Sequence, residues 1–371
     1  MPAFVLFAAL MKVLLPLIKQ LHLWTGLTSG LIAAFSGITG AIYIWQPEFT
    51  AALNPQLLTV ANFNSVSEAE IHTAALRLAE KYGDSISILN FPYREQQTVF
   101  VVFKNGETLF YHPVTAQFLG EKSSSMIFFE GLLNIHRTLG IPEYGKYIVG
   151  GSAVVFFMLL LGSGFYIWWT RYRKKLKKGF SLKVRAKPKR FNYDLHKVTG
   201  IIFIVPLAVM AISGAYFTYI PYYKQVFSLA DTIAPNSEQL HPGSDKKTES
   251  FRKRLKTPAT DYVLRAVIFP KAAGEGYQFR YIRQRAINAG LRRVKELKIN
   301  RTGEQLSLTQ FHTDALSDKI LAQMYPIHIG EIAGGFGRLL VFIAGWVPAI
   351  LLISGIRFYL FRKREDFLSR Q

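Results

Sequence analysis

The sequence predicts an all-α membrane protein, a four-helix transmembrane bundle built as a parallel internal repeat, with two small α+β modules on the periplasmic side. Half of the 371 residues are hydrophobic, and four apolar runs reach the length of about 20 residues that crosses a bilayer. A short basic loop separates the second run from the third, and related motifs begin the first and third runs. These observations together define the predicted fold class.

The predicted elements follow one another along the chain. Residues 1–20 are an apolar lead-in, cytoplasmic or interfacial, because no basic stretch precedes them and no small-residue cleavage site follows. A further membrane segment at this position is the alternative. The remaining segments are 21–46 (first span), 47–135 (first module), 136–171 (histidine segment and second span), 172–191 (basic loop), 192–220 (third span), 221–326 (second module), 327–362 (histidine segment and fourth span) and 363–371 (cytoplasmic tail).

The basic loop predicts the orientation. Residues 171–190 contain eleven lysines and arginines and no acid, and short loops of this kind stay on the cytoplasmic side. Both termini are therefore predicted to be cytoplasmic, and both modules to lie on the opposite side of the membrane, in a multi-pass protein. The net charge of +21 does not indicate nucleic-acid binding, since the basic loop adjoins the membrane and no recognition motif accompanies it.

Each module is predicted to be a small α+β unit. In the first module, Ser67 begins a helix to Tyr82, and Asn105-Gly106 is a strong hairpin turn signal. Period-2 patterns predict strands at 86–91, 98–104 and 107–112 in the first module, and at 262–269, 277–284 and 293–299 in the second.

Several kinds of chemistry are excluded by what the sequence lacks. There is no cysteine, which rules out thiolate metal sites, iron–sulfur clusters and covalent c-type haem attachment. No Gly-x-Gly-x-x-Gly or Walker loop is present, so no nucleotide site is predicted. Redox chemistry in this chain would require a non-covalent cofactor.

Four histidines stand at the ends of the predicted spans. Ionisable groups near membrane depth are costly and are functional candidates, and a neutral imidazole is a common metal ligand. A span of about 25 residues at ~1.5 Å each is longer than ~30 Å, so His22 and His136 cannot share one iron. The repeat instead pairs His22 with His196 at the inner face and His136 with His328 at the outer face. We therefore predict two non-covalent haem b groups, with these four residues as cofactor-binding and iron ligands.

Other residues near these histidines suggest secondary roles. Arg137 and Lys197 adjoin ligands and are candidates for pairing with haem propionates, or for snorkelling to headgroups. Small residues recur at comparable depth in the spans, where they allow close helix approach and room for flat macrocycles: Ser36-Gly37, Ser163-Gly164, Ser213-Gly214 and Ser354-Gly355. The remaining histidines, His72, His112, His241 and His312, are expected to be solvated or locally bonded.

The same motifs resemble the PepSY-associated transmembrane family of bacterial inner-membrane proteins. The shared features are Leu-His-x-x-Thr-Gly with a later Ser-Gly in both first spans, Ile-His-Arg-x-Leu-Gly before the second span, and His-x-Gly followed by Gly337-Arg338 before the fourth. Within the family the chain is most similar to the siderophore-linked ferric reductases of the ferrioxamine type. The resemblance implies two b-type haems and reduction of siderophore-bound iron in the periplasm, and it leaves the catalytic residues unknown.

The predicted function is a transmembrane electron conduit that reduces a periplasmic ferric siderophore and releases iron as Fe(II), with a cytoplasmic or quinol electron donor. Two other functions stay open. One is a haem-free membrane binding or regulatory protein whose PepSY modules bind a peptide. The other is a transporter of the iron chelate, which would use the repeat for alternating access.

Overall fold

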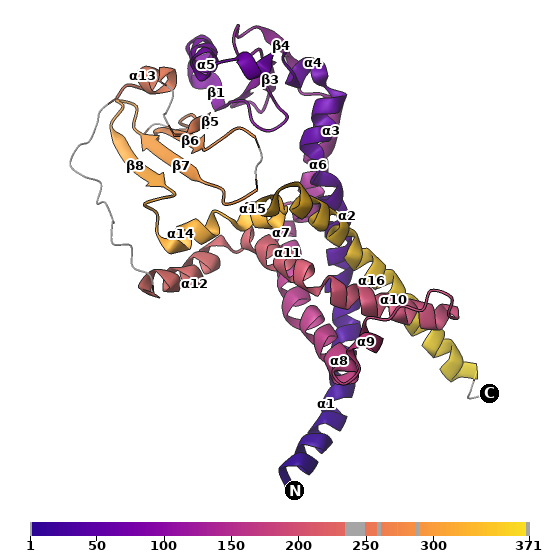
Figure 1. Ribbon diagram of the computed structural model, residues 1–371. Coiled ribbons are helices and arrows are strands. Elements are labelled where there is room, and N and C mark those ends of the chain that lie inside the picture. Colours follow the sequence, from indigo (N-terminus) through magenta and orange to yellow (C-terminus); the bar gives the residue numbers. More distant parts are fainter. Residues whose placement is uncertain (1, 234–248, 258–260, 273, 287–288, 369–371) are drawn as a thin grey trace.

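An eight-stranded antiparallel sheet stands at one end of a group of long helices, and both chain ends lead away from it (Figure 1). The computed structural model describes residues 2–233, 249–257, 261–272, 274–286 and 289–368. Its first half contains α1 (Pro2–Leu27), α2 (Ser29–Tyr43), α3 (Gln46–Leu53), α4 (Pro55–Leu58), η1 (Phe63–Ser65), α5 (Glu68–Tyr82), η2 (Gly83–Ser85), β1 (Ile86–Asn90), β2 (Val99–Phe103), β3 (Thr108–Tyr111), β4 (Phe118–Glu121), α6 (Ser124–Thr138), α7 (Gly145–Val155), the π-helical η3 (Phe156–Leu161) and α8 (Gly162–Tyr172).

The second half repeats this order of elements. It contains α9 (Leu176–Gly179), α10 (Pro188–Ile202), α11 (Ile204–Tyr216), α12 (Ile220–Ile233), α13 (Phe251–Lys256), β5 (Val263–Ile268), β6 (Tyr277–Ile282), β7 (Val294–Ile299), β8 (Gln305–Gln310), α14 (Leu316–Leu321), α15 (Met324–His328), η4 (Glu331–Ala333) and α16 (Gly334–Leu368). In each half, a broken helix leads into four strands, and a helix with a histidine at or near its end precedes a long apolar helix.

The predicted four-helix transmembrane bundle is wrong. Among the described residues only two helices, Gly145–Tyr172 and Glu331–Glu365, are long and apolar enough to span a membrane unbroken. The other predicted spans are bent pairs: Leu14–Leu27 with Ser29–Tyr43 at 43°, and Pro188–Ile202 with Ile204–Tyr216 at 61°. The described chain therefore has two spans, or up to four if each bent pair counts as one.

Both bends have local causes that the apolar pattern conceals. Near the first, Thr25, Thr28 and Ser29 bond back to the carbonyls of Leu21, Trp24 and Thr25 at 2.7–2.9 Å, a pattern that bends helices. Near the second, Pro206 lacks an N–H and its ring clashes with the carbonyl of Ile202, so the helix breaks at Phe203.

The two predicted α+β modules are in fact one sheet. Its strand order is β4-β3-β2-β1-β5-β6-β7-β8, so the first strand of each half meets its counterpart at the centre. There β1 and β5 run antiparallel, with Ile88 opposite Ile268 and Leu89 opposite Val267. The sequence predicts each strand from its own residues, and it carries no signal that β1 and β5 pair with each other.

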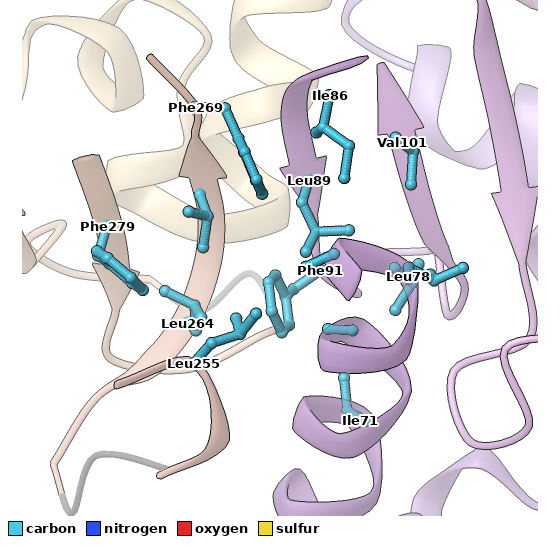
Figure 2. Close-up of a cluster of buried hydrophobic side chains, with 14 of the residues drawn as sticks. Ile71, Leu78, Ile86, Leu89, Phe91, Val101, Leu255, Leu264, Phe269 and Phe279 are labelled. Atoms are coloured by element: carbon cyan, nitrogen blue, oxygen red, sulfur yellow. The ribbon is translucent and has the colours of Figure 1, made fainter. Parts of the chain in front are cut away.

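A single hydrophobic core packs against the paired strands β1 and β5, which we call the central seam. Leu89 of β1, Phe91 directly after it and Leu264 of β5 are at most 1 % exposed. They belong to one buried cluster that includes side chains of both halves. Figure 2 shows Leu255 and Phe279 of the second half pointing toward Phe91 and helix α5 of the first. Burial of apolar surface across the seam therefore holds the two halves together.

The strands predicted in each half are confirmed, as is the helix that starts at Ser67, whose side chain forms a full capping box with Glu70. The edge strands β4 and β8 were not predicted. Their residues are mostly exposed or half-buried. The four residues of β4 lack the alternation that marks a strand in sequence, whereas Leu306 and Leu308 of β8 do alternate with polar residues and were overlooked.

The seam predicts a specific cross-link. Backbone hydrogen bonds join Ser87 to Phe269 and Phe91 to Arg265. Ile88 and Ile268, next to the first of these, are therefore a non-hydrogen-bonded pair, the kind in which opposing side chains lie closest. Because the chain has no cysteine, Ile88→Cys with Ile268→Cys should form a single disulfide in an oxidising medium. Mass spectrometry of the linked peptides after proteolysis measures it.

The matched control is Ile88→Cys with Gln278→Cys. Gln278 lies on β6 opposite Ile268, one strand further from β1, so its Cα is about 9–10 Å from that of Ile88 and beyond disulfide reach. Equal cross-linking of both pairs would contradict the strand order.

Candidate functional site

The structure brings the four membrane-proximal histidines together as two pairs. The ring centroids of His22 on α1 and His196 on α10 are 6.1 Å apart, and the rings are nearly perpendicular. The centroids of His136 on α6 and His328 on α15 are 6.2 Å apart. We call the first the distal pair and the second the sheet-side pair, after their positions relative to the sheet. Each pair takes one histidine from each half of the chain.

Every one of these rings is held through Nδ1 by a helix of its own half. The Nδ1 atom of His136 lies 2.8 Å from the carbonyl oxygen of Ser36, and that of His196 lies 2.9 Å from the carbonyl oxygen of Leu351. His22 and His328 lie beside the backbone of Leu160 and Met210. Since a carbonyl can only accept, Nδ1 carries the proton in the rings of His136 and His196.

A hydroxyl three residues after each carbonyl forms a second contact to Nδ1. The distances are 3.0 Å for Ser163 to His22, 3.2 Å for Ser354 to His196, 3.1 Å for Ser213 to His328 and 3.4 Å for Thr39 to His136. Each hydroxyl donates its own proton to a carbonyl of its helix, which leaves a lone pair for the Nδ1–H. The tautomer is therefore fixed, with Nε2 as the free lone-pair nitrogen of each ring.

A glycine follows each hydroxyl residue and leaves room for the ring. A Cβ on Gly40 would lie 2.8 Å from Cε1 of His136, and one on Gly214 would lie 3.0 Å from Cε1 of His328. Gly164 and Gly355 have the same relation to His22 and His196, at 3.1 and 3.2 Å. The repeated unit is thus a carbonyl, then a Ser or Thr three residues later, then a glycine.

This unit corrects the sequence interpretation of the first span. There the unit is Thr39-Gly40, whereas Ser36-Gly37, which resembles the other dipeptides more closely, has a different role. A Cβ on Gly37 would lie 2.3 Å from the carbonyl oxygen of Gly345, so these glycines allow α2 and α16 to cross closely. Four Ser-Gly dipeptides were selected from the sequence, and Thr39-Gly40, the dipeptide that faces His136, was not among them.

The π-helical segment η3 supplies the backbone beside one of the four rings. Leu160, whose backbone lies beside His22, belongs to η3, where the chain departs from α-helical hydrogen bonding. Such segments free backbone groups for other partners and recur at functional sites. The distal pair is therefore positioned by an irregularity within the second span.

A buried ion pair fixes the helices around the sheet-side pair. Arg338, near the start of α16, forms a bidentate pair with Glu48 and donates to the carbonyl of Ile44 at 2.6 Å. A Cβ on Gly337 would lie 2.1 Å from the carbonyl oxygen of Gly330, so the chain after His328 folds tightly against α16. The Gly337-Arg338 motif thus positions the segment that carries His328.

Neither basic neighbour of a histidine reaches into a pair. Lys197 is buried, and its Nζ binds Asp194 and the carbonyls of Lys178 and Ser181 at 2.9–3.0 Å, which ties the basic loop to α10. Arg137 is exposed. Lys197 is therefore a structural residue.

Three of the other histidines, His72, His112 and His312, lie in the sheet domain, apart from both pairs. His72 is buried and bonds the carbonyl of Leu255 at 2.6 Å, while Nδ1 of His112 accepts from the backbone of Val114 and Thr115. His312 is exposed. His241 lies outside the described residues.

The two pairs are incomplete as metal sites formed by side chains alone. Within the part of the chain that the structure describes, no group of three or more His, Cys, Asp or Glu side chains is placed to hold a metal ion. Each pair offers two nitrogen donors. A metal held there must take its remaining ligands from a bound group.

The chain belongs to the family described as the PepSY-associated TM region, whose model matches residues 19–362. The match includes all four histidines and both halves of the sheet. Together with the exposed apolar side chains of its long helices, such as Trp24 and Val205, it shows a membrane protein. No match was found among curated proteins.

The Arg338–Glu48 pair gives a stability prediction. Replacing Arg338, whose side chain is 8 % exposed, by Met leaves the Glu48 carboxylate without its guanidinium. We expect a loss of about 2 kcal/mol, below the value for a fully buried pair because Glu48 is 35 % exposed. Thermal unfolding of the full chain in detergent measures it. Lys189→Met, which breaks an exposed pair with Glu365, should change the midpoint little, and equal shifts would contradict the role of Arg338.

Proposed function

We propose that this membrane protein is a haem-dependent electron conduit that reduces a ferric siderophore outside the cytoplasmic membrane and releases the iron as Fe(II). The observation that supports it best is the presence of two histidine pairs at two levels of the helical region. In each ring Nδ1 is hydrogen-bonded and Nε2 is free. The proposed cofactors are two non-covalent haem b groups, one at the distal pair and one at the sheet-side pair.

The residues present fit such a cofactor. Two metal–nitrogen bonds of roughly 2 Å each, added to the inner halves of two imidazole rings, give a centroid separation close to the observed 6.1 and 6.2 Å. Two side-chain donors suffice when a macrocycle supplies the other ligands. The glycines beside each ring keep the space against Cε1 open, which any larger residue would fill.

The protein's own groups prepare each site for that cofactor. The carbonyl and hydroxyl that contact Nδ1 orient the ring, keep the proton on Nδ1, and make Nε2 a stronger donor. A haem with two imidazole ligands supplies a one-electron carrier. Apolar residues of the long helices, among them Leu207 and Val347 in a buried cluster, surround the region and exclude water.

The direction of transfer follows from the basic loop. Its lysines and arginines favour a cytoplasmic position for α9 and both chain ends. In that orientation the sheet would face the periplasm, and the distal pair would lie nearer the cytoplasm. An electron from a cytoplasmic or quinol donor would pass from the distal to the sheet-side pair. There it would reduce one Fe(III) to Fe(II), which hard oxygen donors of a siderophore hold less tightly.

The haem content of single variants tests this function. His196→Ala should remove the signal of the distal haem and His328→Ala that of the sheet-side haem, each about half of the absorbance per protein, because each variant leaves one imidazole at its pair. Absorption spectra of protein purified from haem-replete cells measure this.

The matched control is His312→Ala, an exposed histidine of the sheet domain, which should keep the wild-type spectrum. A wild-type protein without haem absorbance would contradict the proposal.

Proteoliposomes with a reductant inside and a ferric siderophore outside, assayed with an Fe(II)-specific dye, test the reduction itself. Movement of the intact chelate without reductant would identify a transporter instead.

The hydroxyl contacts give a finer test. Ser163→Ala removes the 3.0 Å contact to His22 and should speed haem loss to a scavenger protein by about tenfold, a usual effect of removing such an outer partner. Ser36→Ala is the control, because the Ser36 hydroxyl has no hydrogen-bond partner among the described residues, and the contact of Ser36 with His136 is made by its backbone carbonyl. Similar rates for the two variants would show that the hydroxyls do not hold the rings.

A further inference from the structure

Four arginines converge between the sheet and the helix that carries His328. They are Arg94 after β1, Arg265 on β5, Arg285 after β6 and Arg292 before β7, and we call them the arginine cluster. Backbone bonds fix their segments, since the N–H of Arg94 donates to the carbonyl of Arg285 at 2.9 Å. Gln323 bonds both the N–H and the carbonyl of Arg292, at 2.7 and 3.0 Å.

Two tyrosine rings stack with three of these guanidinium groups. The Tyr93 ring centroid lies 4.5 Å from Cζ of Arg265 and 5.0 Å from Cζ of Arg94. The Tyr325 ring centroid lies 5.2 Å from Cζ of Arg292 and 5.9 Å from Cζ of Arg94. Stacking holds the guanidinium planes while leaving their N–H edges able to donate.

The charges in the cluster do not balance. Glu68 pairs with Arg285 at 2.5 Å, and Glu331 pairs with Arg94 at 2.5 Å. Arg265 and Arg292 form no ion pair within 4.0 Å with any residue that the structure describes. The contacts of Arg265 with oxygens of Asn90 and Phe91 are long, at 3.4–3.5 Å. Arg292 shares only the field of the Glu331 carboxylate that pairs with Arg94, so two half-buried positive charges lack an ion-pair partner of their own among the described residues.

The pKa of Arg265 reflects this excess of positive charge. Burial, reinforced by the neighbouring arginines and opposed by Tyr93, lowers the pKa of Arg265 to about 10. The group is still protonated at neutral pH, in surroundings that disfavour its charge. An anion placed beside it would relieve that cost.

The cluster adjoins the sheet-side pair. Tyr325 contacts Phe217 with ring centroids 6.4 Å apart, and Phe217 contacts His328 at 5.6 Å. Only one aromatic ring thus separates the stacked tyrosine from an imidazole of the pair. A ligand held by Arg292 would lie close to the sheet-side histidines.

We propose that Arg265 and Arg292 form a binding site for a carboxylate group. Guanidinium forks match the two oxygens of a carboxylate, and both arginines keep partial exposure through which one can enter. Two sources offer this group: a carboxylate-bearing ferric chelate, or the propionates of the haem proposed for the sheet-side pair. The first source would define the substrate as an anionic chelate and rests on the function proposed above, whereas carboxylate binding itself does not.

Titration calorimetry with citrate on the detergent-solubilised full chain tests the site. We expect saturable binding that Arg265→Gln with Arg292→Gln weakens by about a hundredfold, tenfold for each lost charged contact. The control, Arg283→Gln with Lys298→Gln, removes two exposed charges of the same domain and should keep the wild-type affinity. Arg292→Gln alone, with an expected tenfold loss, serves if the double variant is not recovered folded.

Haem-loaded and haem-depleted preparations separate the two sources. Citrate binding to both preparations identifies an exogenous chelate as the source of the carboxylate. Binding to the haem-depleted protein alone, together with faster haem loss from the cluster variant, identifies the propionates. Absence of citrate binding in both, or equal affinity of cluster and control variants, overturns the proposal, and neither result depends on whether the chain reduces iron.

Discussion

The hydrogen bond from each imidazole Nδ1 to a carbonyl or hydroxyl of a neighbouring helix is the contact on which the arrangement of the helices depends. In each half, the first-span histidine is held by the second span, and the histidine before the second span is held by the first span. These reciprocal bonds lock two helices of a half together at two levels. The pairs then form between halves, so the same rings that join helices within a half also meet across the repeat.

This constraint explains why small residues and irregular backbone gather at the same points. A ring can reach a carbonyl of a neighbouring helix only if a glycine leaves space beside it, as Gly164 does for His22. The carbonyl must also be free to accept, which η3 provides at Leu160. Arg338 then holds the start of α16 against α3 through Glu48 and against the end of α2 through the carbonyl of Ile44.

Sequence patterns predicted the parts of this protein whose signals are local. The six inner strands, the capped helix after Ser67 and the four membrane-proximal histidines could be found by period, capping and position. The joining of β1 to β5 could not, because each strand satisfies its own pattern whichever neighbour it takes. Thr39 was missed for a related reason, since Ser36 matched the other dipeptides better and only the helix rotation distinguishes the two. Pro206 is visible in the sequence, but the apolar run around it suggested an unbroken span.

The meeting of β1 with β5 has a consequence for how such a protein can arise. Two equivalent strands paired side by side in opposite directions is the arrangement that identical chains adopt about a two-fold axis. A polypeptide corresponding to one half would leave its central strand edge open, and that edge is self-complementary. Such a polypeptide would complete both the sheet and the histidine pairs by forming a symmetric homodimer, and gene fusion would then make the association permanent.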